Sequence, residues 1–309
     1  MRYFLAVLLI VLIIFFQYQA RNHPELYGNS LSDRILHPFD TRLRYRIAEV
    51  DPRFGLSTEQ LIEISEQATK IWSDATGKSY FVYDPNARLA LYFQYDDRQY
   101  ETEQRQKHIQ NIDHEQHIWT QKKQYVDQQQ QQLDSQRDVL NIKQKELDEL
   151  ILMHNNMITQ INQSGGAPRE QKQHLEAQSS EIEKQISAMK TEIAQHNFNI
   201  QRINHQVDEL NQINQKIDVS IMQFNQKFQP RLFDKGSFNG QSIHIYEFEN
   251  ENDLRLTLAH EFGHALGLKH HDTATALMYP MLKDQDMQNF RLQPADLALL
   301  AARKNKIKN

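Results

Sequence analysis

The chain has 309 residues, a formal net charge of −5 and no cysteine, and its mean hydropathy is −0.72. The acidic balance gives no general attraction to nucleic acid, and the lack of cysteine excludes disulfides, thiolate metal sites and cysteine nucleophiles. The length allows one large domain or two small ones. Because the hydropathy is so low, a globular unit must share this length with a long solvated element.

The N-terminus carries an unbroken apolar run, Tyr3 to Phe16, directly after a positive charge. This pattern is typical of a secretory signal, and it is shorter than the roughly 18 apolar residues of a membrane span. Tyr3 and Tyr18 are placed to lie at the two interfaces of an uncleaved anchor. We therefore predict a signal-anchor in residues 1–20, with a cleaved signal peptide as the alternative, and a tether in residues 21–38. Both alternatives export the rest of the chain.

The first part of a globular domain is predicted in residues 39–100. Leu43 to Val50 alternates between apolar and polar residues as a strand does. A helix follows, which begins after a capping-box pattern at Ser57 and ends at Gly77. One face of this helix is apolar and is made by Leu61, Ile64, Ala68 and Trp72. One or two further strands are predicted around residues 81–95.

Residues 101–225 are predicted to form an insertion of a different character. In its first arm, every seventh position is apolar: Ile112, Trp119, Val126, Leu133, Leu140 and Leu147. After a break at Gly165 to Pro168, the second arm carries two such series. The first is Ile186, Ile193, Ile200, Val207, Ile221 and Phe228, interrupted at Asn214, and the second is Ile182, Met189, Ile203, Leu210, Ile217 and Phe224, interrupted at His196. This spacing indicates a coiled coil. The single break favours an antiparallel hairpin, with arms of about 60 residues that are roughly 90 Å long.

Two histidines of the insertion, His154 and His196, fall on the apolar seam. In a hairpin folded at Gly165, residue 196 lies opposite about residue 135, so the two imidazoles are roughly 28 Å apart along the helices. A second metal site is therefore not predicted there. The arm is interpreted as a docking element for a partner, for a substrate or for a second copy, with an inert spacer as the alternative.

The residues that carry chemistry lie in the segment His-Glu-Phe-Gly-His-Ala-Leu-Gly-Leu-Lys-His, residues 260–270. His260 and His264 are four residues apart, so on a helix they lie one turn apart on one face and can hold the same ion. Gly267 can adopt the left-handed conformation that ends a helix. The chain then turns and returns His270 toward the first two histidines.

The spacing of these histidines predicts a zinc site. Zinc binds imidazole nitrogen readily, and a catalytic zinc usually keeps three protein ligands and one water. His260, His264 and His270 are therefore predicted to be the ligands of Zn²⁺. Glu261 directly follows the first ligand, where its carboxylate can reach that water and act as the general base of hydrolysis.

These residues, together with Met278 in the Leu-Met-Tyr-Pro segment at 277–280, resemble the metzincin metallopeptidases, and that segment is most similar to the matrixin branch. The resemblance implies that Met278 forms an apolar floor beneath the histidines. It also implies an α+β catalytic domain, with a mixed sheet and an active-site helix, in residues 39–100 and 226–309. The antiparallel coiled-coil insertion would interrupt this domain.

Three features depart from the matrixin pattern. A chain without cysteine has no cysteine-switch latency. The Gly/Asp-rich loops that bind structural calcium and a second zinc in the family are missing from the sequence, so neither ion is carried over. The predicted hairpin stands where the family has a short loop.

The sequence thus predicts an exported, membrane-anchored zinc endopeptidase that hydrolyses protein or peptide substrates outside the cytoplasm. The alternative, from another class, is a membrane-tethered coiled-coil interaction protein with a vestigial metal domain. The intact Glu261 argues against this alternative, because a scaffold has no need of that base.

Overall fold

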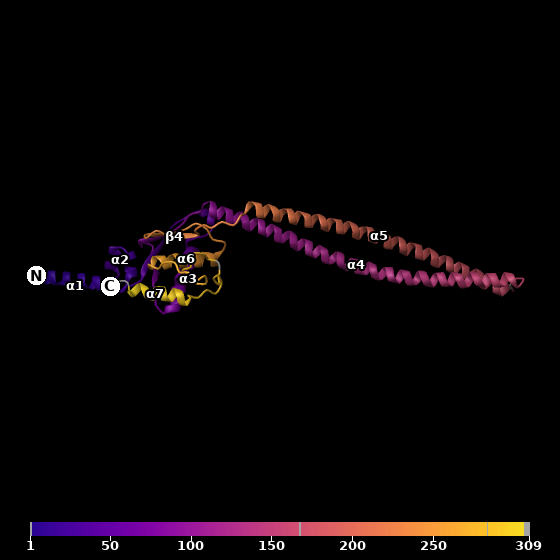
Figure 1. Cartoon of the computed structure of the whole chain (residues 1–309), viewed down its shortest axis with the longest axis horizontal. Helices are drawn as coiled ribbons and strands as arrows, with labels where there is room; N and C mark the ends of the chain where they lie inside the picture. The colour runs from indigo at the N-terminus through magenta and orange to yellow at the C-terminus, as the bar shows by residue number, and fades with distance from the viewer. Residues whose placement is uncertain (1, 167, 283, 306–309) are drawn as a thin grey trace. The chain divides into compact units, whose positions relative to one another are not determined.

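The computed structural model describes residues 2–166, 168–282 and 284–305. Figure 1 shows the helices and strands with their labels. The chain divides into two compact units: Met1–Gln106 together with Pro230–Asn309, and Lys107–Gln229.

The first unit is built around a five-stranded sheet. Its elements are α1 (Arg2–Asn22), η1 (Pro24–Gly28), α2 (Leu31–Leu36), β1 (Leu43–Val50), η2 (Pro52–Phe54), α3 (Thr58–Thr76), β2 (Phe81–Tyr83), β3 (Leu89–Phe93), the first turns of α4 (Asp97–Gln163), β4 (Gly236–Phe238), β5 (Ser242–Ile245), α6 (Glu251–Ala265) and α7 (Pro294–Asn305). The strand order is β2-β1-β3-β5-β4. The first four strands in this order pair in parallel, whereas the edge strand β4 is antiparallel to β5. The predicted α+β class with a mixed sheet is confirmed.

Two helices cover one face of the sheet. Helix α3 packs against β1, β2 and α6, and α6 also packs against β4 and β5. Aromatic rings fill the space between the layers: the Phe262 ring of α6 lies 5.0 Å from the ring of Tyr45 and 4.7 Å from the ring of Phe81. Because these side chains come from a helix and from two strands, they fix where α6 lies on the sheet.

Helix α3 has a defined start and end. Ser57 Oγ accepts a hydrogen bond from Gln60 N (3.2 Å), and Gln60 Oε1 accepts one from Ser57 N (2.9 Å). Gly77, at φ +66, ends the helix. The apolar face between these ends is buried at Leu61, Ile64, Ala68 and Trp72. Trp72 reaches α6, where its Nε1 donates to Ala259 O at 2.9 Å.

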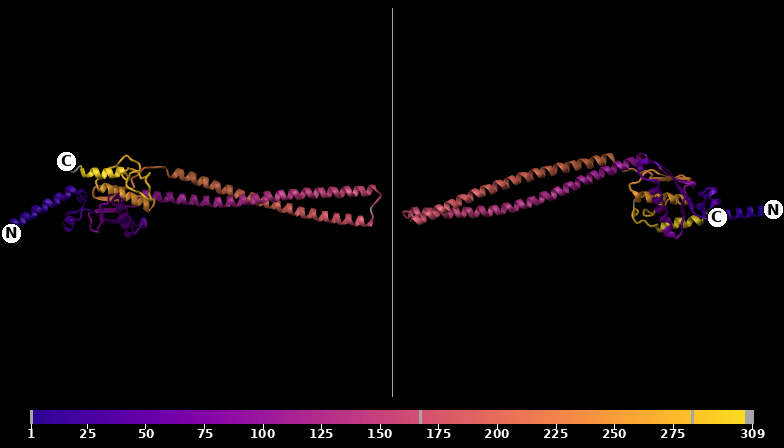
Figure 2. Two further views of the ribbon diagram at one scale, coloured as in Figure 1. Left: turned by 90° about the horizontal axis from the view of Figure 1, so that it is seen from below. Right: turned by 180° about the vertical axis from the view of Figure 1, so that it is seen from behind.

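The second unit contains most of α4 and α5 (Arg169–Lys227). The two helices run antiparallel and side by side, as both views in Figure 2 show. Buried apolar side chains join them in two clusters: Val126, Leu133, Ile203 and Leu210 in one, and Leu147, Ile182 and Met189 in the other. We call this pair of helices the arm. Whether the arm winds as a coiled coil stays a prediction.

The seam histidines of the arm lie apart from one another. His154 is buried and bonds to Gln178 Oε1 (3.1 Å) and Ser179 Oγ (2.9 Å). His196 lines a cavity of about 420 Å³ together with Ser135 on the facing helix. The two imidazoles therefore have separate surroundings.

Residues 2–20 of the predicted signal-anchor lie within α1, and residue 1 lies outside the described residues. In the described part of the chain, no helix is both long enough and apolar enough to cross a membrane. The membrane anchor therefore stays a prediction.

Candidate metal centre

Helix α6 and the turn after it position the predicted ligands. The helix begins at the cap residue Asn250, whose side-chain oxygen accepts hydrogen bonds from Asn252 N (3.0 Å) and Asp253 N (3.1 Å). It ends at Ala265, and Gly267 follows at φ +85, a conformation that a Cβ would disfavour. This left-handed turn sends the chain back toward the face of α6 that carries the first two histidines.

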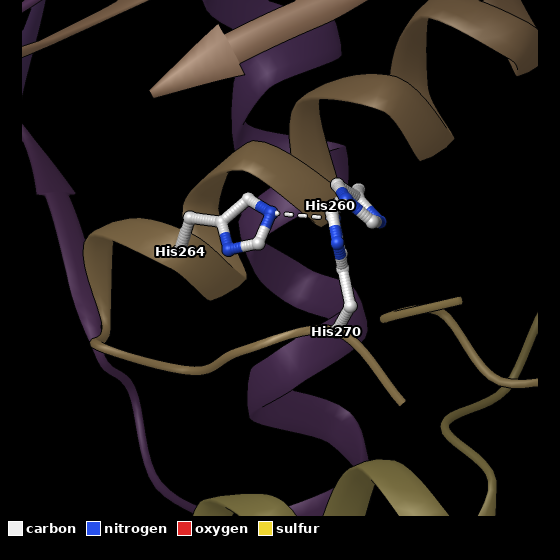
Figure 3. Close-up of side chains that lie close together, drawn as sticks. All are labelled: His260, His264 and His270. Carbon is white, nitrogen blue, oxygen red and sulfur yellow. Dashed lines mark hydrogen bonds between the residues drawn. The ribbon is translucent and has the colours of Figure 1, made fainter. Parts of the chain in front are cut away.

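Three imidazoles meet at this point. Figure 3 shows the rings of His260, His264 and His270 turned toward one another. His270 Nε2 lies 3.3 Å from His260 Nε2 and 3.2 Å from His264 Nε2. A tetrahedral zinc with nitrogen ligands at 2.0–2.1 Å holds those nitrogens about 3.3–3.4 Å apart. The two separations from His270 therefore fit a zinc ion, and the three ligand atoms all lie within 4.8 Å of one another.

The second nitrogen of two rings is held by the backbone. His260 Nδ1–H donates to Leu277 O at 2.6 Å, and His264 Nδ1–H donates to Leu268 O at 2.9 Å. In the neutral rings, both Nε2 atoms then carry lone pairs that face His270. A single proton on His270 Nε2 can satisfy only one of them, whereas a cation accepts all three lone pairs. The donor set therefore suits a metal ion better than a hydrogen-bonded cluster.

Burial keeps the imidazoles of His260 and His264 neutral. It lowers the pKa of His260 to about 4, although the hydrogen bond to Leu277 opposes the shift and the neighbouring His264 and His270 add to it. Burial also lowers the pKa of His264. Because only a neutral imidazole can ligate a metal, both rings are in the binding form near neutral pH.

Glu261 lies beside the histidines in a buried position, 5% exposed. Burial raises its pKa to about 8, and the charge of Asp234 adds to the shift. No described residue bonds its Oε2 atom. Gly236 on the edge strand makes room for this side chain, because a Cβ there would lie 3.1 Å from Glu261 Cγ and 3.2 Å from Oε1. No motif in the sequence pointed to this contact of Gly236.

The turn beneath the histidines is held by α7. Met278 is fully buried, and Gly263 lies so close to its Sδ that a Cβ there would collide with it. Asp296 Oδ2 accepts from Leu277 N and its Oδ1 accepts from Met278 N, both at 3.0 Å. Leu277 O accepts a hydrogen bond from His260 Nδ1–H. Because Asp296 holds the peptide unit that carries this oxygen, it also helps to orient His260, a predicted ligand.

Sequence reasoning singled out the histidines, Glu261, Gly267 and Met278, and the structure brings the ring nitrogens of the three histidines together. It did not find Asp296, Gly236 or the contact of Trp72. For the contact of Trp72, the sequence holds one weak signal, which is Gly263. Glycine is unfavourable inside a helix, and a Cβ at this position would collide with Trp72 and Met278.

The fold and the site together define a metzincin-like domain that could hold a metal ion on three histidines. A family model described as Matrixin matches residues 39–302. The chain therefore belongs to the matrixin family, and the predicted resemblance is confirmed. Matrixins are zinc-dependent, which agrees with the histidine triad.

Similarity to individual matrixins is confined to short segments. Matrix metalloproteinase-16 from Rattus norvegicus and that from Homo sapiens are each 48% identical over 46 residues, or 15% of this chain and 8% of the relative. Matrix metalloproteinase-27 from Homo sapiens is 39% identical over 71 residues, or 21% of this chain and 14% of the relative. Matrilysin from Felis catus is 45% identical over 72 residues, or 21% of this chain and 28% of the relative. The chain thus matches less than a third of the length of each of these proteins.

Proposed function

We propose that this protein is a zinc-dependent endopeptidase that hydrolyses peptide bonds of protein substrates. The observation that carries the proposal is the convergence of the Nε2 atoms of His260, His264 and His270 beside a buried Glu261. Bound zinc would supply a water of lowered pKa and polarise the scissile carbonyl.

The residues of the chain have separate roles in this proposal. The three histidines hold the ion, with two of them oriented by Leu277 O and Leu268 O. Glu261 takes a proton from the attacking water on a carboxylate oxygen and delivers it to the leaving amine. Burial raises the pKa of this carboxyl. A nearby cation lowers it again and so favours the ionised carboxylate, which is the form that can accept the proton.

A single substitution tests the proposal. Glu261→Gln keeps the volume of the side chain but removes the base, so proteolysis of an unstructured protein substrate is expected to fall about 10²- to 10⁴-fold. Zinc content, measured by elemental analysis, is expected to stay at one ion per chain. Glu251→Gln, at an exposed position on the same helix, is the matched control and is expected to keep full activity. Full activity in Glu261→Gln would overturn the mechanism.

The arm is proposed to dock a protein partner, a substrate or a second copy of the chain. Its support is that several large apolar side chains of α5 remain exposed, among them Phe198 (61%), Ile193 (39%) and Ile200 (37%). The same observation supports the rival function, an interaction protein with a vestigial metal domain. If the zinc-loaded native chain and Glu261→Gln were equally inert toward every substrate but bound the same partner, the rival would be correct.

We also propose that the chain is exported and acts outside the cytoplasm, tethered to a membrane by its N-terminal segment. The support is the uncharged apolar run from Tyr3 to Phe16, which directly follows the positively charged Arg2.

A further inference from the structure

The N-terminal part of the first unit carries most of its exposed apolar surface. Of the large apolar side chains that are exposed in the described part of this unit, eleven lie between Ile10 and Phe39 and three lie elsewhere. Five of the eleven, which we call the α2 patch, lie in and around α2: Tyr27 (63% exposed), Leu31 (75%), Ile35 (66%), Leu36 (73%) and Phe39 (85%). A contiguous apolar patch on a protein surface usually marks a site of interaction.

The backbone under the α2 patch is firmly held. Asn29 Nδ2 donates to Arg42 O and Asn29 Oδ1 accepts from Arg44 N, both at 2.8 Å, which fixes the segment to the start of β1. Ser30 and Asp33 then form a capping box at the start of α2. The apolar side chains therefore point outward from a fixed base, and their exposure does not come from a loose segment.

The α2 patch is continuous with α1. The Phe39 ring lies 6.0 Å from the Phe15 ring, and Gln19 Nε2 donates to Pro38 O at 2.6 Å. On α1, the residues Ile10, Val11, Leu12, Ile13 and Ile14 are each 45–59% exposed. The helix and the patch thus form one apolar surface whose two parts contact each other directly.

This segment carries two arginines beside its apolar residues, whereas its carboxylates Glu25 and Asp33 are buried. Arg21 is in the last turn of α1. The Arg34 guanidinium lies 5.8 Å from the Phe16 ring centroid, and Asp33 is buried in its cap. Arg21 is exposed, whereas Arg34 Nη2 donates to Phe16 O at 3.4 Å. An exposed arginine beside apolar side chains that include tyrosine and phenylalanine suits a lipid interface, where the cation reaches the headgroups.

We propose that the α2 patch lies in the headgroup region of a lipid bilayer and holds the first unit at the membrane surface as a second contact beside α1. Amphipathic helices at interfaces bury their apolar face about 5–10 Å into the boundary between headgroups and acyl chains. The proposal extends the membrane-side location proposed above and does not depend on peptidase activity. A second copy of the chain is the competing occupant.

The experiment uses the full chain and exploits its lack of cysteine. Leu36→Cys, Ile13→Cys and Leu232→Cys each provide a single site for a polarity-sensitive fluorophore, in the patch, on α1 and at a matched control position that is 86% exposed. Each labelled protein is mixed with vesicles of phosphatidylcholine and phosphatidylglycerol, with and without lipids that carry a quencher at a shallow or a deep position.

At position 36, emission is expected to rise several-fold with vesicles and to be quenched more by shallow than by deep quenchers, whereas position 232 stays unchanged. A response at position 13 without one at position 36 would overturn the patch while leaving an anchor in α1. No response at either position would overturn both the patch and the proposed tether. An increase at position 36 that follows protein concentration in the absence of vesicles would assign the patch to a second copy and overturn the lipid contact.

Discussion

Asp296 acts at the metal centre from a helix that carries no predicted ligand. Its two carboxylate oxygens accept from the buried N–H groups of Leu277 and Met278. Leu277 O in turn fixes the tautomer and direction of the His260 ring. A substitution at Asp296 should therefore be felt at the metal site although the side chain does not touch it.

Asp296→Ala is expected to weaken zinc affinity by about 10- to 100-fold, the range seen when a group that orients a ligand is removed. It should also destabilise the first unit by about 1–3 kcal/mol for each buried donor left unpaired. Chelator competition measures the first effect and denaturant unfolding the second. Asp286→Ala is the matched control, because it removes an exposed carboxylate that accepts from Gln288 N and Asn289 N and not from the turn at Leu277 and Met278. Equal zinc affinity in the two variants would contradict the role of Asp296.

Gly236 lies against Glu261, the proposed base, and not against the three histidines. A Cβ at this position meets Glu261 at a distance that forces it to shift by a few tenths of an ångström. We expect Gly236→Ala to lower kcat about tenfold, since small misplacements of a catalytic group are costly, while zinc content stays the same. Ser237→Ala serves as the control, because successive strand residues point to opposite faces of the sheet. A Gly236→Ala variant that lost zinc would show that the substitution disturbs the ligands instead.

The histidines and Glu261 could be predicted from the sequence because their spacing is local: one helical turn and one glycine turn bring the ligands together. Asp296 and Gly236 could not, since they reach the site through tertiary contacts. Asp296 is 18 residues from Met278 along the chain, and no short spacing rule connects them. The need for a glycine at position 236 becomes clear only when the structure shows that Glu261 packs against it.

At the scale of elements, prediction succeeded where periodicity is long. Helix α3 has a capping box and an apolar face, and α4 and α5 carry apolar residues at heptad spacing, so these helices could be predicted. The edge strand β4 was not predicted, because its three residues, Gly236–Phe238, show no alternation. This strand forms by antiparallel pairing with β5. Such pairing depends on a neighbouring strand, so it cannot be predicted from the three residues of β4 alone.

The seam of the arm contains one polar position that allows a test. His154 is 5% exposed, and among the described residues its side chain bonds only across the seam, to Gln178 and Ser179 on the facing helix. Polar groups on a seam set the register at some loss of stability. His154→Leu is therefore expected to raise the stability of the arm by about 1 kcal/mol, seen as a higher midpoint of the helical signal in thermal circular dichroism.

His117→Leu is the control for this prediction, because His117 is exposed on the same helix and its substitution should leave the midpoint unchanged. A lower midpoint for His154→Leu would mean that the hydrogen bonds of His154 stabilise the arm more than an apolar contact does.

At the scale of the whole molecule, the low hydropathy required a long solvated element beside a globular unit, and the chain does divide into two compact units. The sequence did not reveal that residues near the two ends of the chain form a buried ion pair. Glu25 lies in a segment predicted to be a tether, yet its side chain is fully buried, with Lys78 Nζ at 2.7 Å and Arg303 Nη2 at 2.9 Å. Arg303 Nη1 also donates to Leu266 O at the end of α6. A contact between residues 25 and 303 has no sequence signal.

This buried cluster predicts how the stability of the first unit depends on pH. Burial alone would raise the pKa of Glu25, but the hydrogen bond from Lys78 and the charges of Arg303 and Lys78 outweigh it, so the pKa is lowered from its usual 4.5. Because the folded-state pKa lies below the unfolded one, the stabilisation is fully present above the unfolded pKa. It is lost as the pH falls through the folded-state pKa.

Glu25→Gln should therefore lower the free energy of unfolding at pH 7 by about 3 kcal/mol, since it leaves Arg303 buried without a counter-charge. The difference from the native chain should shrink as the pH falls below 4.5, because the native carboxyl is then protonated as well. Urea unfolding across this range, followed by the fluorescence of the buried Trp72, measures both effects. Glu49→Gln, at an exposed position on β1, should match the native chain at every pH. If the loss of unfolding free energy in Glu25→Gln stayed constant down to low pH, the side chain would contribute through its shape and not through its charge.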